Sequence, residues 1–213
     1  MKSYKCIIFD CDGVLVDSEV LAIRTLVDLA NAQGAEIDLN YALRDFKGSY
    51  LAACFRKIEE ISGKPLPPDF EVQFRKRSFD VFKKELQPVK GIKRVLETLQ
   101  IPFCTASSGP QEKIRVNLAT TGLIHFFEGR IFSCYDIGKW KPDPAIFLHA
   151  SEVMGFAPKD CLVIEDSIPG VQAAKAGGFD VFGFAEGNEN DGFGGDATKI
   201  FHSMSGLMSL IDQ

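Results

Sequence analysis

Short apolar runs separated by helical patterns constrain the fold of this chain more than any other feature of its sequence. Five runs have the length and continuous hydrophobicity of strands that are buried on both faces of a parallel sheet. From about residue 90 onward they alternate with helical patterns, which predicts a parallel sheet with helices on both faces. The predicted strands span residues 4–9, 102–106, 130–133, 161–165 and 180–184.

Several intervening helices have recognisable ends or faces. In "KPDPAIFLHASEVMG", Asp143 is placed as the N-cap, Pro144 as the first helical residue and Gly155 as the C-terminal stop. A helix whose alanines suit close packing on a sheet is predicted over 169–178, and the glycine-rich stretch 183–195 predicts a loop. One further helical face is formed by Val89, Ile92, Leu96 and Leu99.

Residues 18–87 interrupt this rhythm with a block that contains no convincing strand. Two apolar stripes at helical spacing predict two helices, a turn-rich break covers 61–69, and a third helix is predicted over 70–86. The first stripe is Ile23, Leu26, Val27 and Ala30, and the second is Leu51, Cys54, Phe55, Ile58 and Ile61.

The two patterns together define an architecture. We expect an α/β fold whose core, residues 1–16 and 88–213, is a Rossmann-like, doubly wound parallel sheet. Residues 17–87 would be inserted into it as an α-helical bundle cap. An insertion at this point follows the carboxyl end of the first strand, where open parallel sheets bind ligands.

The composition is that of an ordinary globular protein. The 213 residues are 46% hydrophobic and carry a formal net charge of −5, so neither nucleic acid nor an anionic membrane is expected as a partner. No apolar run approaches the roughly 20 residues that span a bilayer, and the N-terminus lacks the pattern of a signal peptide. Six cysteines without a CxxC pair indicate reduced thiols in a cytoplasmic protein rather than a zinc site.

Two carboxylates stand at the end of the first predicted strand, in "IIFDCDGVLVDSE". Asp10 closes the strand and Asp12 follows two residues later, so strand-like spacing would point both side chains the same way. Two carboxylates this close repel by on the order of 1–4 kcal/mol, depending on the effective dielectric constant. Such a pair persists when it holds a cation or when it divides into a base and an acid. Taken alone, the motif is explained more simply as a strand-to-turn connection.

Polar side chains also follow the other predicted strands. Ser107 and Ser108 come just after one strand, Lys141 stands at the start of a helix, and Glu165 and Asp166 end a further strand. Hydroxyls and free amides bind phosphate oxygens, and a lysine neutralises phosphate charge. Each residue alone has an ordinary explanation as a cap, a solvated charge or a turn former. Their joint occurrence at one rim of a parallel sheet indicates a phosphate-handling site.

These residues identify a resemblance to the haloacid dehalogenase superfamily of phosphatases. "FDCDGVLVDSE" is similar to the first motif, Ser107 to the second, Lys141 to the third, and the pair Glu165 and Asp166 to the fourth. The resemblance covers nearly the whole chain, including the helical cap. "FSCYDIGKWKPDPA" and "FKG" look most like the β-phosphoglucomutase-like and 6-phosphogluconate phosphatase-like branch.

The resemblance implies a Mg²⁺-dependent phosphomonoester hydrolase that acts on a small phosphorylated sugar or sugar acid. Asp10 would be the nucleophile that forms an aspartyl-phosphate, and Asp12 would be the general acid and base. Ser107, the amide of Ser108 and Lys141 would hold the phosphoryl oxygens. The site is complete within one chain, so a monomer is expected.

The same resemblance implies the metal and the substrate contacts of the cap. Asp10, the backbone carbonyl of Asp12, and Asp166 would hold Mg²⁺, and Glu165 would support the metal directly or through water. The best cap candidates for substrate binding are Lys47 and Gly48 in "FKGS". Arg56 is a weaker cap candidate, and the cluster Arg75, Lys76 and Arg77 is expected to be a solvated helix face.

Three alternatives remain open at this stage. A phosphomutase of the β-phosphoglucomutase kind would carry a histidine in the early cap helix, where this chain has Ala22. A 2-haloacid dehalogenase would lack Asp12, and a non-catalytic phosphoacceptor would lack both the paired acids and the cap. Three histidines match no metal-ligand spacing and are expected to be structural or surface residues: His125, His149 and His202.

Overall fold

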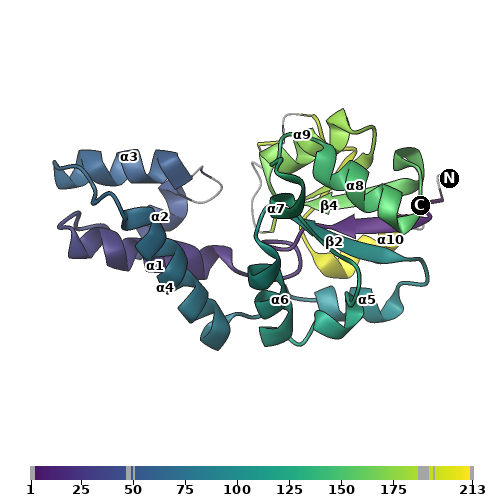
Figure 1. The fold of residues 1–213 in the computed structure, drawn as a ribbon, viewed down its shortest axis with the longest axis horizontal. Coiled ribbons are helices and arrows are strands. Elements are labelled where there is room, and N and C mark those ends of the chain that lie inside the picture. The colour runs from purple at the N-terminus through teal and green to yellow at the C-terminus, as the bar shows by residue number, and fades with distance from the viewer. Residues whose placement is uncertain (1–2, 47–48, 50, 187–191, 194, 212–213) are drawn as a thin grey trace. The chain divides into compact units, whose positions relative to one another are not determined.

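The computed structural model describes residues 3–46, 49, 51–186, 192–193 and 195–211. The chain divides into two compact units, each coherent by itself (Figure 1). One unit is formed by Met1–Val16 and Gln87–Gln213, and the other by Asp17–Leu86. The first boundary between the units is at the predicted position, and the second lies one residue earlier than predicted.

The first unit contains a six-stranded parallel sheet with the strand order β3-β2-β1-β4-β5-β6. The predicted α/β fold with a doubly wound parallel sheet is confirmed, and each of the five predicted strands is present. All four residues of β1 are fully buried, which explains why this strand is a continuous apolar run rather than an alternating one. The strands are β1 (Cys6–Phe9), β2 (Phe103–Ser107), β3 (Ile131–Ser133), β4 (Cys161–Glu165), β5 (Asp180–Phe184) and β6 (Lys199–Phe201).

Strand β6 was not predicted from the sequence. It has only three residues, of which one is buried, and such a short edge strand leaves no periodic signal. The loop predicted over 183–195 is wrong at its start, because Gly183 and Phe184 still belong to β5 and pair with β6. Residues 187–191 and 194 of that predicted loop lie outside the described residues.

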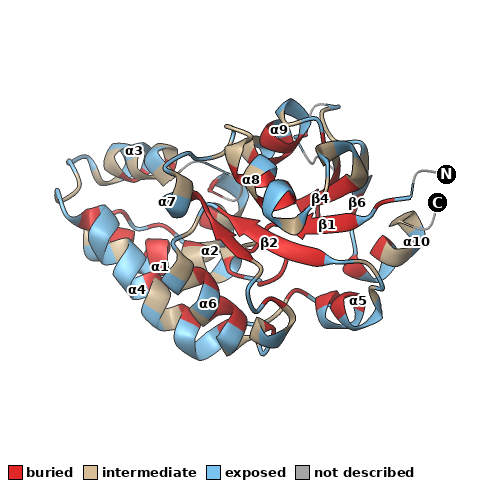
Figure 2. Ribbon diagram, turned by 45° about the vertical axis from the view of Figure 1, so that its right-hand side comes forward, coloured by how far each residue is buried: buried red, intermediate tan, exposed pale blue. Residues whose placement is uncertain are grey.

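Helices cover both faces of the sheet, with α8 and α9 on one face and α5 and α6 on the other (Figure 1). The buried strands lie between helices whose outer surfaces are exposed (Figure 2). The helices of this unit are α5 (Ile92–Thr98), α6 (Gln111–Thr120), α7 (Cys134–Ile137), α8 (Ala145–Met154), α9 (Ile168–Ala176) and α10 (Leu207–Ile211).

Helix α8 begins one residue later than predicted. Pro144 occupies the N-cap position, and Asp143 Oδ1 accepts a hydrogen bond from the Ala145 amide at 2.9 Å. Asp143 therefore still satisfies a free amide of the first turn. The predicted stop is confirmed, because Gly155 is the C-cap and has a φ of 81°, in the left-handed region.

The second unit is a bundle of helices in which the described residues contain no strand. The stripe that begins at Ile23 is buried throughout, whereas in the second stripe Cys54 and Ile58 are buried and Ile61 is 39% exposed. The short helix α2 was not predicted; it buries only Ala42 and is capped by Asp38, whose Oδ1 accepts from the Tyr41 amide at 2.8 Å. The helices are α1 (Glu19–Ala32), α2 (Leu39–Asp45), α3 (Leu51–Ser62) and α4 (Phe70–Glu85).

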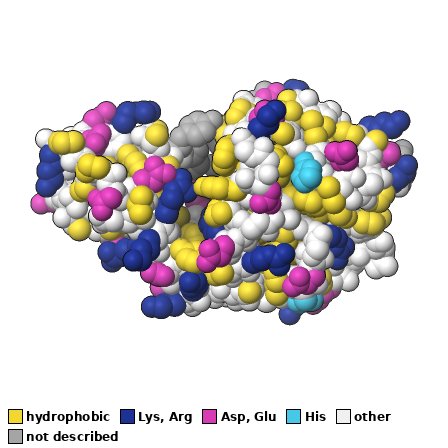
Figure 3. Space-filling view, viewed as in Figure 1, with side chains coloured by type: hydrophobic (Ala, Val, Ile, Leu, Met, Phe, Trp, Pro, Cys, Tyr) yellow, Lys and Arg dark blue, Asp and Glu magenta, His cyan; other side chains and the backbone are white. Residues whose placement is uncertain are grey.

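On the face drawn in Figure 3, acidic and basic side chains are interspersed, and neither charge predominates. In the described part of the chain, no helix is both long and apolar enough to cross a membrane. All six cysteines are free and buried.

Candidate active site

Asp10 stands at the carboxyl end of the central strand β1. Its amide donates to the carbonyl of Ile164 at 2.9 Å, so the backbone is still tied to β4 while the chain begins to leave the sheet. The following turn is closed by the amides of Leu15 and Val16, which donate to the carbonyl of Cys11 at 2.9 and 3.1 Å. Asp10 is only 7% exposed. Its carboxylate is therefore held in a fixed, largely dry place at the sheet edge.

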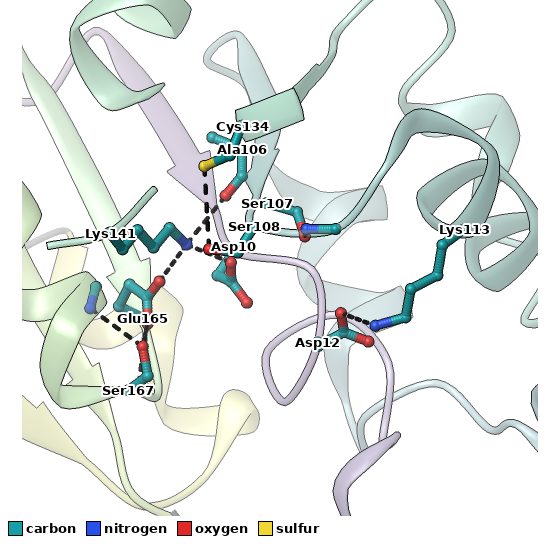
Figure 4. A network of polar contacts seen from close by, with 12 residues as sticks. Asp10, Asp12, Ala106, Ser107, Ser108, Lys113, Cys134, Lys141, Glu165 and Ser167 are labelled. Carbon is teal, nitrogen blue, oxygen red and sulfur yellow. Dashed lines mark hydrogen bonds and ion pairs between the residues drawn. The ribbon is translucent and has the colours of Figure 1, made fainter. Parts of the chain in front are cut away.

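Lys141 joins the ends of three adjacent strands (Figure 4). Its Nζ donates to Asp10 Oδ1 at 2.5 Å, to the carbonyl of Ala106 at 3.2 Å, and to Glu165 Oε1. Only 5% of the Lys141 side chain is exposed. A buried cation is stable only when it is paired and hydrogen-bonded, and these three acceptors meet that requirement.

Burial and charge shift the pKa values of this group. Burial raises the pKa of Asp10 to about 7, against the attraction of Lys141, and repulsion from Glu165 adds to the rise. Burial alone would lower the pKa of Lys141, but attraction to Asp10 and Glu165 outweighs it and the pKa lies above its usual value. Lys141 is therefore protonated at neutral pH. A second cation beside Asp10 would favour the ionised form of Asp10.

Glu165 anchors Lys141 and the start of α9. Its Oε2 accepts from the amide and the hydroxyl of Ser167, at 2.9 and 2.8 Å, while Oε1 accepts from Lys141. A Cβ on Gly170 would lie 2.0 Å from this carboxyl group, so the close approach requires glycine there. Both oxygens of Glu165 are engaged. The geometry therefore favours an anchoring role for Glu165 over the predicted support of a metal.

Asp12 lies apart from the Lys141 group and is held by helix α6 (Figure 4). Lys113 Nζ donates to Asp12 Oδ2 at 2.6 Å, and Asn117 Nδ2 donates to Oδ1 at 3.2 Å. Burial lowers the pKa of Lys113, but attraction to Asp12 outweighs it and raises the pKa above the usual value. The strand-spacing argument for Asp10 and Asp12 does not apply beyond the end of β1, although the charge of Asp12 acts on Asp10 and adds to the rise of its pKa. Strand β1 ends at Phe9, and the chain turns before it reaches Asp12.

Ser107 is the last residue of β2, and Ser108 follows it. Ser107 is buried, and its Oγ accepts from the Gly109 amide at 3.1 Å, which leaves its own hydroxyl hydrogen able to donate. Ser108 is exposed, and its Oγ accepts a weak hydrogen bond from Cys134 Sγ at 4.0 Å. Ser133 Oγ donates to the carbonyl of Gly109 at 2.7 Å, which fixes the shape of the loop.

The side chain of Asp166 lies against Gly13. A Cβ on Gly13, whose φ is +81°, would lie 1.8 Å from Asp166 Oδ2. The Asp166 carboxylate therefore reaches the turn that follows Asp10 and Asp12. Among the described residues no three His, Cys, Asp or Glu side chains form a ready-made metal group. Mg²⁺ does not require one, because it is commonly held by one or two carboxylates plus water and substrate phosphate. The oxygen donors of Asp10 and Asp166 fit Mg²⁺.

The model of one protein family, haloacid dehalogenase-like hydrolase, matches residues 4–178 of this chain. The chain belongs to the haloacid dehalogenase-like hydrolases. The predicted resemblance is confirmed.

Several relatives of this hydrolase align over most of its length. The 6-phosphogluconate phosphatase of Escherichia coli is 31% identical over 211 residues, which cover 99% of this chain and 96% of that protein. A phosphorylated carbohydrates phosphatase of Thermotoga maritima is 28% identical over 192 residues, 88% of each chain. The crystal structure of a conserved haloacid dehalogenase-like protein from Agrobacterium tumefaciens has a TM-score of 0.90 at 29% identity, covering 99% of this chain and 98% of that one.

The remaining sequence candidates lie elsewhere or are not described. Lys47 and Gly48, predicted to bind substrate, lie outside the described residues of this hydrolase. Arg56 is exposed on α3. On α4, Arg75 pairs with Glu71 at 2.6 Å, as expected for a solvated helix face. The histidines have structural surroundings: His149 packs on Phe132, His202 Nδ1 lies 2.8 Å from the carbonyl of Ala185, and His125 lies on Phe126.

Sequence reasoning missed Lys113, Asn117 and Ser167. Lys113 and Asn117 are four residues apart in "GPQEKIRVNL", directly after the serines, so their helical spacing was a usable signal. Ser167 follows the acidic pair and is the N-cap of α9, where its Oγ accepts from the Gly170 amide at 3.1 Å. The position of Ser167 before a predicted helix could have indicated an N-cap. Nothing in the sequence indicates its hydrogen bond to Glu165.

Proposed function

We propose that this hydrolase is a Mg²⁺-dependent phosphatase that removes the phosphoryl group of a small phosphorylated sugar or sugar acid through an aspartyl-phosphate intermediate. The observation that carries the proposal is the pairing of buried Asp10 with Lys141, 2.5 Å away, next to the hydroxyl-bearing end of β2. The printed names of two relatives support the substrate class, since one is a 6-phosphogluconate phosphatase and the other a phosphorylated carbohydrates phosphatase.

In the first half of the reaction, a carboxylate oxygen of Asp10 forms a bond to phosphorus. The bond from phosphorus to the sugar oxygen breaks, its electron pair stays on that oxygen, and Asp12 donates a proton to it. Ser107 and the amide of Ser108 donate hydrogen bonds to the phosphoryl oxygens, and Lys141 balances their charge. The sugar leaves as a neutral alcohol.

In the second half, water attacks the phosphorus of the aspartyl-phosphate. The water gives a proton to Asp12, the bond from phosphorus to Asp10 breaks, and the carboxylate of Asp10 recovers its electron pair. Asp12 is protonated again and phosphate is released, so one water is consumed for each ester cleaved. Two acids are needed because one must be ionised to attack while the other carries the proton.

Asp10 and Asp166 would hold the Mg²⁺ ion, with the backbone carbonyl of Asp12 as a further oxygen ligand. When bound, the ion would supply positive charge that offsets repulsion between these carboxylates and the phosphate dianion. Lys141 provides the same compensation next to Asp10 and is held in place by Glu165.

We infer that the helical unit, Asp17–Leu86, acts as the cap that selects the substrate, with Lys47 and Gly48 as its candidate binding residues. The catalytic side chains come from one chain, so the proposed enzyme acts as a monomer. The substrate is a small phosphorylated molecule, and neither nucleic acid nor a membrane has a role in the reaction.

Phosphate release from a panel of compounds tests this function. The panel contains 6-phosphogluconate, hexose 6-phosphates, β-glucose 1-phosphate and phosphoglycolate, each with Mg²⁺ and beside an Asp10→Asn control. Release from one sugar or sugar acid phosphate, well above the rest and absent in the variant, is expected. Isomerisation of β-glucose 1-phosphate without phosphate release would show a mutase instead.

A further inference from the structure

The carboxylate of Asp12 is held by two side chains of α6 that the proposed reaction does not yet use. Lys113 Nζ lies 2.6 Å from Oδ2, and Asn117 Nδ2 lies 3.2 Å from Oδ1. The two residues are one helical turn apart and lie on the same face of the helix. Because each carboxylate oxygen has its own donor, both the position and the rotation of the Asp12 carboxylate are fixed.

This contact differs from an ordinary surface ion pair. The side chains of Asp12 and Lys113 are each only 30% exposed, and Asn117 is fully buried. Within the described residues, Asn117 Oδ1 has no hydrogen-bond partner. A buried, unsatisfied amide oxygen lowers stability, and the apolar packing of α6 is already provided by Ile114 and Leu118. The side-chain amide of Asn117 therefore lowers the stability of the fold, as is typical of residues at functional sites.

Helix α6 starts in the loop that carries the phosphate-binding serines. The Gly109 amide donates to Ser107 Oγ at 3.1 Å, and Ser133 Oγ donates to the Gly109 carbonyl at 2.7 Å. The loop therefore has a defined shape directly before the helix begins at Gln111. The loop that would hold the phosphoryl group leads directly into α6 and so positions Lys113. The proposed phosphate contacts and the contact with Asp12 therefore come from one continuous segment.

We propose that Lys113, assisted by Asn117, is a positioning residue for Asp12 in its acid and base roles; this inference rests on the proposed function. When the O–H bond of Asp12 breaks and the proton passes to the leaving oxygen, negative charge develops on the Asp12 carboxylate. The Lys113 cation and the Asn117 amide already point at that charge, so they stabilise it without rearrangement. The contribution to the rate of cleavage therefore depends on proton transfer from Asp12 to the leaving oxygen.

Substrates with two different leaving groups distinguish a role of Lys113 in proton transfer from a purely structural role. A sugar alkoxide must be protonated as it departs, whereas p-nitrophenolate departs as an anion. The test compares kcat/KM for the preferred sugar phosphate and for p-nitrophenyl phosphate in Lys113→Met, Lys113→Arg and Arg115→Met. In Lys113→Met, kcat/KM for the sugar phosphate is expected to fall on the order of 10- to 100-fold, with a change within about threefold for p-nitrophenyl phosphate. Lys113→Arg is expected to restore most of the loss.

Arg115→Met is the matched control, because it removes an exposed cation from the same helix, where Arg115 lies 3.8 Å from Glu128. It is expected to leave both substrates unchanged. Retained p-nitrophenyl phosphate turnover also shows that a variant is folded. Asp12→Ala shows how far kcat/KM for the sugar phosphate falls, relative to p-nitrophenyl phosphate, when the proposed acid itself is removed.

The outcomes separate the inference from the proposed function. If Asp12→Ala is selective while Lys113→Met is silent or lowers both substrates equally, the role of Lys113 is wrong and the proposed function stands. If Asp12→Ala shows no selectivity, the acid role of Asp12 fails, and the inference fails with it. Selective loss in both variants, with rescue by arginine, supports the inference.

Discussion

Lys141 Nζ lies 2.5 Å from Asp10 Oδ1, and 5% and 10% of the two side chains are exposed. The same ammonium group binds Glu165, which is fully buried. One cation therefore holds two carboxylates at the ends of β1 and β4. This arrangement fixes Asp10, the proposed nucleophile, and gives Lys141 a role in stability beside its proposed role in the reaction.

Replacing Lys141 separates these two roles. Lys141→Met would leave Asp10 and Glu165 as buried like charges, so the free energy of unfolding is expected to fall by about 3–5 kcal/mol. Turnover is expected to fall on the order of 10³-fold, because the charge that balances the phosphoryl oxygens is lost. Urea unfolding and phosphate release measure the two effects. Lys139→Met is the control, since Lys139 is 61% exposed and lies 3.6 Å from Asp143. Equal losses in the two variants would contradict the account.

Gly13 is predicted to be essential to the proposed metal site. In Gly13→Ala, the new methyl group would collide with the Asp166 carboxylate, which lies 1.8 Å from the Cβ position. We expect the Mg²⁺ concentration required for half-maximal turnover to rise at least about tenfold, since a ligand is displaced. Gly122→Ala is the control: Gly122 has a φ of +72° and nothing within 4 Å of its Cβ position, so it adds only backbone strain of about 1–2 kcal/mol. An unchanged Mg²⁺ requirement in Gly13→Ala would remove Asp166 from the metal site.

Removal of divalent metal tests the oxygen-ligand chemistry directly. EDTA is expected to abolish phosphate release, and added Mg²⁺ to restore it. Asp166→Asn removes a charged ligand and should raise the Mg²⁺ requirement, whereas Asp160→Asn loses only a contact of 3.3 Å with exposed Lys5 and should not. Turnover that persists at full rate in EDTA would show a metal-independent reaction.

Cys11 lies between Asp10 and Asp12, the two proposed catalytic acids, but is predicted to be unreactive. It is fully buried, and burial raises the pKa of its thiol well above the usual value, with further increases from Asp12 and Asp10. The thiol therefore stays protonated in the folded protein at pH 8, and thiol reagents react with it only after unfolding. Cys11→Ala is expected to keep turnover within about threefold of the parent protein. Loss of activity on mild alkylation of the native protein, traced to Cys11, would overturn this view.

The positions of most site residues could be predicted from the sequence, because the carboxyl ends of parallel strands meet at one edge of the sheet. This rule placed Asp10, Ser107 and Glu165 correctly without any knowledge of strand order. Lys141 was found as a cation at a helix start, and the structure brings it to the same edge. In each case a local pattern and a topological rule pointed to the same place.

What the sequence did not reveal depends on directions that only the folded backbone fixes. Asp12 was expected to follow strand alternation, but the turn after Asp10 sends it toward α6. Lys113 was not singled out because a lysine on a helix is usually solvated, and its contact with Asp12 spans 101 residues of sequence. Glu165 was grouped with the metal ligands from the family resemblance, whereas its bonds to Lys141 and Ser167, which no sequence pattern revealed, favour an anchoring role.

The most direct test of the central claim is to look for phosphate on Asp10 during turnover. The enzyme is mixed with Mg²⁺ and its preferred sugar phosphate, quenched in acid within the first turnovers, digested and analysed by mass spectrometry. We predict phosphorylation of the peptide that contains Asp10, which decays as substrate is exhausted and is absent from Asp10→Asn. Full turnover with no phosphorylated peptide, or turnover that survives in Asp10→Asn, would contradict the assignment of Asp10 as the nucleophile.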